Sequence, residues 1–145
     1  MTPLNLEVLA PAALLIAWSL VMMFWTVAKR FPAFGKAGID LGSEPGGRYV
    51  DAESQMPARV NWVGHNANHL MEQPTIFYAV VGVLALTTEP GTGALWAWGY
   101  LALRVLHSLW QSLVNTVPVR FVIFALSNVC LIVLCYHAVR ATITI

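Results

Sequence analysis

The sequence predicts an all-α integral membrane protein, built as a bundle of four transmembrane helices. Of its 145 residues, 58% are hydrophobic and 10% are charged, and the mean hydropathy is +0.67. Soluble domains usually carry about 25% charged and roughly 45–50% apolar residues, so this chain has too few polar side chains to cover a soluble globule. One transmembrane helix takes about 20 mainly apolar residues, and the chain length therefore allows four spans but not six.

Four apolar segments meet this requirement, and breaks in composition separate them. Residues 6–28 carry no charge after Glu7, and no basic region or small-residue cleavage site flanks them, so we expect an uncleaved first helix. Residues 29–57 hold most of the charges together with several prolines and glycines, which predicts an exposed loop. We place the other spans at residues 60–88, 94–115 and 119–139 of a single domain covering residues 1–145.

The basic residues divide unevenly between the connections. The first connection contains Lys29, Arg30, Lys36 and Arg48, and the third ends at Arg120, whereas the N-terminus and the second turn contain none. Because basic residues favour the cytoplasmic side, we expect these two connections in the cytoplasm and both termini on the other side. In a bacterium this would be the inner membrane. The formal net charge of +1 offers no basic face for nucleic acid.

Polar residues inside the spans follow two stripes at helical spacing. An ionisable group in the hydrocarbon layer costs about 2.5–3.5 kcal/mol, so such groups face a bundle interior or a wet cavity. On the second span the stripe consists of Asn61, His65, Asn68 and Glu72, with His69 beside it. On the third span it consists of Tyr100, Arg104, His107, Gln111 and Asn115.

We expect these two stripes, with Arg120 at the start of the fourth span, to enclose one pocket near the cytoplasmic end. The alternative is that the polar residues only bond the helices together, at roughly 0.6 kcal/mol per bond. A carboxylate, two arginines and three histidines are more than packing needs, which favours the pocket.

Pro74 interrupts the second span beside its stripe. A proline has no N–H, so the carbonyl of Leu70 loses its helical partner one turn from Glu72. The free carbonyl can accept a hydrogen bond from a ligand amine. A proline that only kinks the helix explains the sequence equally well.

A metal site is a second way to interpret the second-span stripe. His65 and His69 are four residues apart, and Glu72 follows three residues later on the same helical face. The run HNANH has the spacing of a zinc-protease helix, but Asn66 stands where the catalytic glutamate would be. We therefore predict no metal.

Two segments resemble a known family. Residues 68–79, NHLMEQPTIFYA, and residues 104–124, RVLHSLWQSLVNTVPVRFVIF, resemble the MAPEG family, the membrane-associated proteins in eicosanoid and glutathione metabolism. The specific parts are Glu72 with a proline soon after it, and Arg104, His107 and Arg120, whose spacing is similar to that of the prostaglandin E synthase branch. The resemblance implies a homotrimer that binds glutathione at subunit interfaces near the cytoplasmic side.

The resemblance also implies roles for individual residues. Arg120 falls on the arginine that stabilises the glutathione thiolate, and Glu72 falls on the carboxylate that holds the amino group of glutathione. An arginine in a low-dielectric site favours a thiolate over a thiol, which lowers the pKa of the thiol and creates a nucleophile. The other residues expected to contact glutathione are His65, Asn68, His69, Arg104, His107 and Gln111.

Two functions from different classes follow. One is a membrane glutathione-dependent transferase or peroxidase that acts on lipophilic electrophiles entering from the bilayer. The other is a catalytically silent MAPEG-fold protein that serves as a structural or accessory subunit of a larger membrane complex. Departures from the family pattern favour the second: His65 and His69 replace an arginine and an asparagine, Gln111 replaces a tyrosine, and Phe121 replaces a serine.

Overall fold

The structure is a computed structural model that describes residues 4–40, 42, 46 and 48–143. These residues form helices and no strand, which confirms the predicted all-α class. The helices are α1 (Leu9–Ala37), α2 (Ala58–Glu72), α3 (Pro74–Thr87), α4 (Ala94–Leu113) and α5 (Val117–Ile143), with short 3₁₀ helices η1 (Leu6–Val8) and η2 (Tyr49–Gln55) before α1 and α2. The four expected spans thus appear as five α-helices, because the second is divided into α2 and α3.

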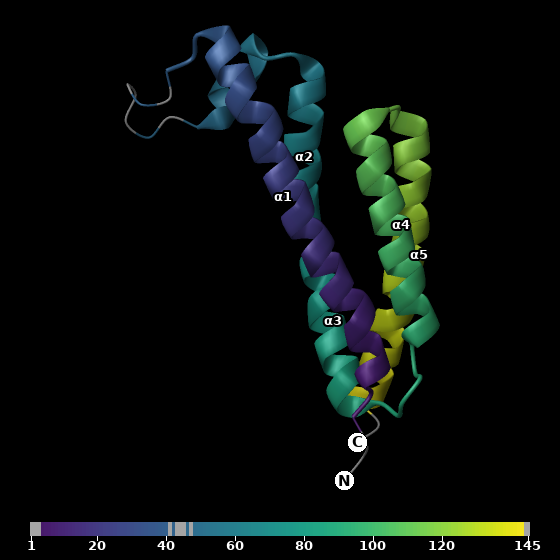
Figure 1. The fold of residues 1–145 in the computed structure, drawn as a ribbon. Helices are drawn as coiled ribbons and strands as arrows, with labels where there is room; N and C mark the ends of the chain where they lie inside the picture. Colours follow the sequence, from purple (N-terminus) through teal and green to yellow (C-terminus); the bar gives the residue numbers. More distant parts are fainter. Residues whose placement is uncertain (1–3, 41, 43–45, 47, 144–145) are drawn as a thin grey trace.

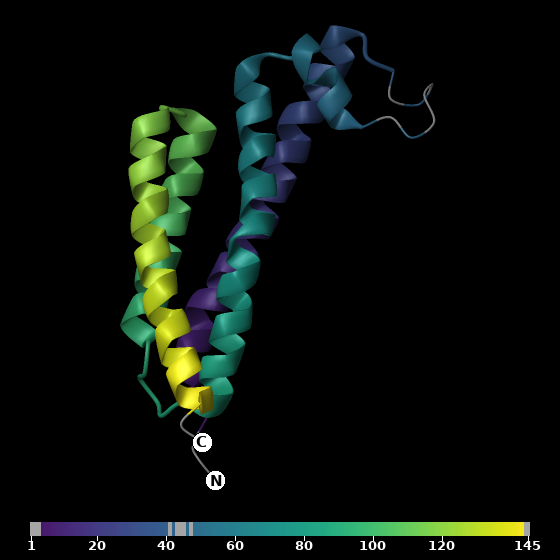
Figure 2. The same ribbon diagram turned by 180° about the vertical axis from the view of Figure 1, so that it is seen from behind.

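The helices form two arms (Figure 1). One arm pairs α1 with the α2–α3 segment, and the other is the hairpin of α4 and α5. The arms lie against each other at the end where α3 packs on α5, and they diverge toward the end that carries the α4–α5 turn, as the reverse view also shows (Figure 2). Both described ends of the chain therefore lie at the same end of the bundle.

Helix α1 is longer than the expected span and continues into the segment expected as an exposed loop. It runs through Pro32 and ends at Ala37, where Gly38 adopts a left-handed conformation (φ 67°) that caps the last carbonyls. Proline removes one backbone hydrogen bond, but the turns on either side keep the helix continuous. Part of the expected loop is also buried, because η2 packs its Ala52 against Phe34 of α1.

The boundary between α2 and α3 lies at Gln73. Gln73 keeps helical dihedrals (φ −63°, ψ −38°), so the two helices follow each other as one broken span. Pro74 stands at the first position of α3, and the Thr75 hydroxyl donates to the carbonyl of Glu72 at 2.6 Å. The side chain of Gln73 donates to Asn128 of α5, which ties the break to the opposite arm.

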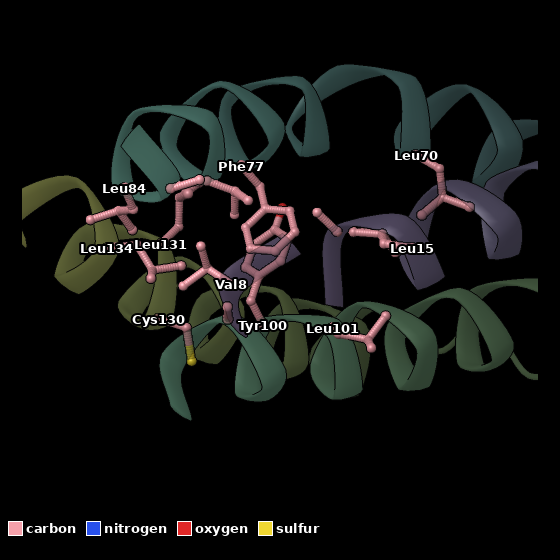
Figure 3. Packing of buried hydrophobic residues seen from close by; sticks show 14 of the residues in the cluster. Val8, Leu15, Leu70, Phe77, Leu84, Tyr100, Leu101, Cys130, Leu131 and Leu134 are labelled. Atoms are coloured by element: carbon pink, nitrogen blue, oxygen red, sulfur yellow. The ribbon is translucent and has the colours of Figure 1, made fainter. Parts of the chain in front are cut away.

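An apolar core joins the arms at the level of α3 (Figure 3). Phe77 and Tyr100 are fully buried, and their rings stack at a centroid distance of 4.2 Å and an interplanar angle of 20°. Aromatic pairs of this kind contribute about 0.5–1.5 kcal/mol beyond the area they bury. Leu84 and Leu134 close the core toward the termini. This apolar core fixes the relative position of the two arms, and α2 and the rest of the α4–α5 hairpin extend from it.

Within the described ranges, three helical segments are long and apolar enough to cross a membrane, namely Leu6–Ala37, Ala58–Thr87 and Val117–Ile143. Helix α4 is not among them, because its buried face carries Arg104, His107 and Gln111. Many large apolar side chains are exposed on the outside of the bundle, such as Phe24, Phe31, Leu86, Leu95 and Ile132. An exposed apolar surface of this extent belongs in lipid.

Candidate active site

A cavity of about 330 Å³ lies between α2, α4 and α5, toward the end where the arms diverge. Its volume is at the lower end of the range of roughly 300–1,000 Å³ typical of small-molecule sites. Six residues predicted from the sequence line it, namely His65, His69, Glu72, His107, Gln111 and Arg120. Val117, Phe121 and Phe124 of α5 complete the wall. The structure thus brings part of each polar stripe and Arg120 to one place.

His69 and Glu72 form a pair on the α2 wall. The Nδ1 atom of His69 lies 3.0 Å from Oε2 of Glu72, and an ionised carboxylate can only accept, so Nδ1 donates. The Glu72 side chain is 69% exposed and His69 is 26% exposed, so the carboxylate stands at the mouth of the cavity. The second oxygen of Glu72 is open to a cationic ligand group.

The ring of His69 packs against two aromatic neighbours. Its centroid lies 5.1 Å from that of His107 and 5.4 Å from that of Phe124. The His107 and Phe124 centroids are 6.0 Å apart, so the three rings form one cluster at the base of the cavity.

Arg104 lies beneath the cavity and is not part of its wall. It is fully buried and donates from Nη2 to the backbone carbonyl of His69 at 3.1 Å. Its Nε and Nη1 atoms have no hydrogen-bond partner among the described residues. The guanidinium carbon lies 5.9 Å from the centroid of Phe124. Arg104 therefore holds α2 against α4 near the break and places a permanent positive charge behind His69.

Arg120 lies in the first turn of α5, where the helix dipole also places partial positive charge. Its Nη1 donates to Oδ1 of Asn115 at 2.8 Å. Asn115 occupies the α4–α5 turn with a positive φ of 59°, a conformation that asparagine tolerates better than most residues. Asn115, expected in the α4 stripe, thus positions the guanidinium from the turn.

Gln111 supplies an unsatisfied acceptor. Its side chain is buried, and Oε1 has no partner among the described residues. A buried carbonyl oxygen without a donor costs about 1–3 kcal/mol, so a ligand N–H or O–H at this position would be favoured.

Two residues of the α2 stripe face elsewhere. Asn68 donates to the Tyr49 hydroxyl of η2, and it lines a groove between α1 and α2. Asn61 donates to the backbone carbonyl of Glu53 at 2.9 Å. Neither lies among the residues that line the cavity, so the expected role of Asn68 in binding stays a prediction.

Glu53 of η2 is a functional candidate that sequence reasoning missed. Its Oε2 lies 2.8 Å from Nε2 of His65, and its Oε1 accepts from Arg30 at 3.1 Å. The Arg30 guanidinium also lies 3.8 Å from the centroid of the Tyr49 ring. A Cβ atom at Gly64 would lie 2.0 Å from Nη2 of Arg30, so only glycine leaves room for this group.

Phe124 is a second cavity residue that the sequence analysis did not identify, because an apolar residue on an apolar helix gives no chemical signal. The position of Phe124 in the sequence does give a signal, since it follows Arg120 by four residues and shares a helical face with it. No comparable signal identifies Glu53, which reaches His65 from a 3₁₀ segment twelve residues earlier.

The family is decided by comparison of the sequence with family models. The model of the MAPEG family matches residues 8–140. The chain belongs to the MAPEG family. A search of the curated proteins and a search of the solved structures gave no match. Family membership and the three apolar segments make this MAPEG protein an integral membrane protein, of a family associated with glutathione and eicosanoid chemistry.

The cavity of this MAPEG protein combines anionic, cationic and imidazole groups. Glu72 at the mouth can hold an amine, Arg120 can hold a carboxylate or thiolate, and Gln111 can accept a hydrogen bond. Within the described part of the chain, no group of three or more His, Cys, Asp or Glu residues is placed to hold a metal ion. This donor set suits a small zwitterionic ligand with a nucleophilic group.

Proposed function

We propose that this protein is a membrane glutathione-dependent transferase or peroxidase that acts on lipophilic electrophiles. The observation that carries the proposal is the convergence of Glu72, His69 and Arg120 on one cavity in a MAPEG chain. Glutathione offers an amino group, two carboxylates and a thiol, and the cavity contains a partner for a charge of each sign.

In the proposed reaction, Glu72 holds the amino group of glutathione and Arg120 stabilises the thiolate. The guanidinium and the first turn of α5 present positive charge where the thiol loses its proton, which lowers the pKa of the bound thiol. Phe121 and Phe124 provide an apolar wall beside this position. A lipophilic electrophile that enters from the bilayer would meet the thiolate there.

Two further inferences, on assembly and on orientation, belong to the same proposal. We infer a homotrimer whose subunits close the cavity, since Glu72 is largely exposed in the single chain. We also infer that the cavity end faces the cytoplasm, since the basic first connection lies at that end. Light scattering of the protein–detergent complex and labelling of single cysteines introduced at each end would test the two inferences.

Isothermal titration of the detergent-solubilised protein with glutathione tests the function. We expect saturable binding that weakens in Glu72→Ala, and turnover with a lipophilic electrophile that falls in Arg120→Ala. Absence of binding at millimolar glutathione would contradict the proposal. Copurification of a stable membrane partner, together with that absence, would instead favour a silent accessory subunit.

A further inference from the structure

We propose that His69 is the base that takes the proton from the glutathione thiol, with Glu72 fixing the orientation of its ring. This role rests on the proposed function, since it is one step of that reaction. It also gives a purpose to a histidine that stands where the family pattern has another residue.

The hydrogen bond to Glu72 selects the tautomer of His69. Because Oε2 of Glu72 accepts from Nδ1 at 3.0 Å, the proton of the neutral imidazole is on Nδ1. The lone pair is then on Nε2, on the other side of the ring. No described residue donates to Nε2 or accepts from it. A carboxylate that orients an imidazole in this way is the arrangement that makes histidine an effective base in hydrolases.

The surroundings hold the ring of His69 in place. Phe124 and His107 pack on it at centroid distances of 5.4 and 5.1 Å. Its backbone carbonyl accepts from the buried Arg104 at 3.1 Å, so the main chain is fixed as well. A base with a fixed position accelerates proton transfer more than one that must be ordered first.

The charged and titratable groups around His69 come from three helices. Glu72 belongs to its own helix α2, Arg104 and His107 belong to α4, and Arg120 belongs to α5. Once His69 is protonated, the carboxylate of Glu72 compensates its charge at 3.0 Å. Arg120 meanwhile compensates the negative charge of the thiolate. Each charge created by the proton transfer therefore has a partner of opposite sign.

The other two cavity histidines fit the role less well. His65 is also paired with a carboxylate, but that group, Glu53, already forms an ion pair with Arg30 at 3.1 Å. His107 forms no ion pair with a carboxylate among the described residues. Among the described residues, only His69 is paired with a carboxylate that forms no ion pair with an arginine or lysine. Bound glutathione would place its amino group at the other oxygen of Glu72, which leaves the Nδ1–Oε2 hydrogen bond in place.

The step balances without an oxidant or a reductant. The thiol proton moves to Nε2 of His69, which leaves a thiolate beside Arg120 and an imidazolium paired with Glu72. The sulfur lone pair then forms a bond to the electrophilic carbon of an unsaturated carbonyl compound. The π electrons of the carbon–carbon double bond are displaced toward the carbonyl group, and the resulting enolate is protonated by Nε2 of His69. The product is the thioether, and His69 is again neutral.

The test is the pH dependence of kcat/KM with glutathione and a lipophilic unsaturated carbonyl compound, in wild type and in His69→Asn. We expect kcat/KM at neutral pH to fall by about 10²–10⁴-fold in His69→Asn, while the Kd of glutathione changes less than the rate. The pH dependence of the remaining kcat/KM of His69→Asn should then reflect only the ionisation of the glutathione thiol. His137→Asn, on α5 and outside the cavity, is the matched control and should behave as wild type.

A second measurement guards against a variant that merely packs poorly. Added imidazole should restore part of the activity of His69→Gly in proportion to its unprotonated fraction. Absence of this rescue with glutathione binding intact would overturn the base role. Loss of binding in both His69 variants would make His69 a binding residue, which also overturns it.

The outcomes separate this role from the proposed function. Wild-type turnover with an unchanged rate and pH profile in His69→Asn would contradict only the base role. Failure of the wild type to bind glutathione would contradict both.

Discussion

The two halves of the second span differ in what they contribute. On one side of Gln73, α3 packs Phe77 and Leu84 into the apolar core that joins the arms. On the other side, α2 presents His69 and Glu72 to a cavity. Helices α4 and α5 contribute to both, so they form part of a scaffold at one level and part of a site at the next. Changes in the core should therefore lower stability, and changes in the cavity should lower binding or rate with little loss of stability.

The largest effect is expected in the core. Phe77→Ala removes a fully buried ring stacked on Tyr100 and should lower the free energy of unfolding by about 3–5 kcal/mol. Phe31→Ala is the matched control, because this ring is exposed on α1 and its loss should change stability by about 0.5 kcal/mol or less. Denaturant unfolding in detergent measures both. Equal losses in the two variants would contradict the assignment of the core.

The next effect is on the rate. Arg120→Ala should lower kcat/KM by about 10²–10³-fold, the range seen when one group that stabilises a developing anion is removed. Its unfolding free energy should stay close to that of the wild type. Arg140→Ala, at the far end of the same helix, is the control and should retain activity. A similar loss in both variants would indicate a general effect of removing positive charge from α5.

A smaller effect is expected on binding. Glu72→Gln removes the charge that holds the glutathione amino group and should raise the Kd about 10- to 100-fold, as for one hydrogen bond to a charged group. A glutathione analogue without the amino group provides the control, because wild type and Glu72→Gln should bind it equally. Titration calorimetry measures the Kd of each of the two ligands for the wild type and for Glu72→Gln. An equal loss with both ligands would show that Glu72 acts through the structure instead.

The smallest effect concerns the packing beside the cavity. Gly64→Ala would place a Cβ atom 2.0 Å from Nη2 of Arg30 and should cost about 1–3 kcal/mol of stability. Gly82→Ala is the matched control in α3, where a Cβ would meet nothing within 4 Å. It should stabilise the helix by about 0.5–1 kcal/mol. Thermal unfolding of the two variants should therefore shift in opposite directions, and shifts of the same sign would contradict the role of Gly64.

The parts of the fold set by local pattern could be predicted from the sequence. Apolar length marked the helices, and helical spacing brought His65, His69 and Glu72 to one wall. The polar stripe of α2 covers a wider arc of the helix than the cavity does, however, so not all of its residues line the cavity. At about 100° per residue, Asn68 and His69 lie on opposite flanks of it, and only the packing of α1 decides that Asn68 turns toward Tyr49.

Contacts made by irregular segments could not be predicted. The position of η2 depends on Arg30, which is buried against Gly64 and bound to Glu53, and none of these residues shares a periodic pattern. Arg104 was expected in the pocket because its charge suggested a ligand. Its contact with a ligand stays a prediction. In the structure it donates to a main-chain carbonyl of α2, where the broken span approaches α4, and no sequence spacing specifies such a bond.

The central claim is that the cavity converts glutathione to its thiolate. The ultraviolet difference spectrum of the wild-type protein with saturating glutathione at neutral pH measures this directly. We predict a thiolate absorbance band that is absent with S-methyl glutathione and much reduced in Arg120→Ala. Bound glutathione without a thiolate band at neutral pH would contradict the claim.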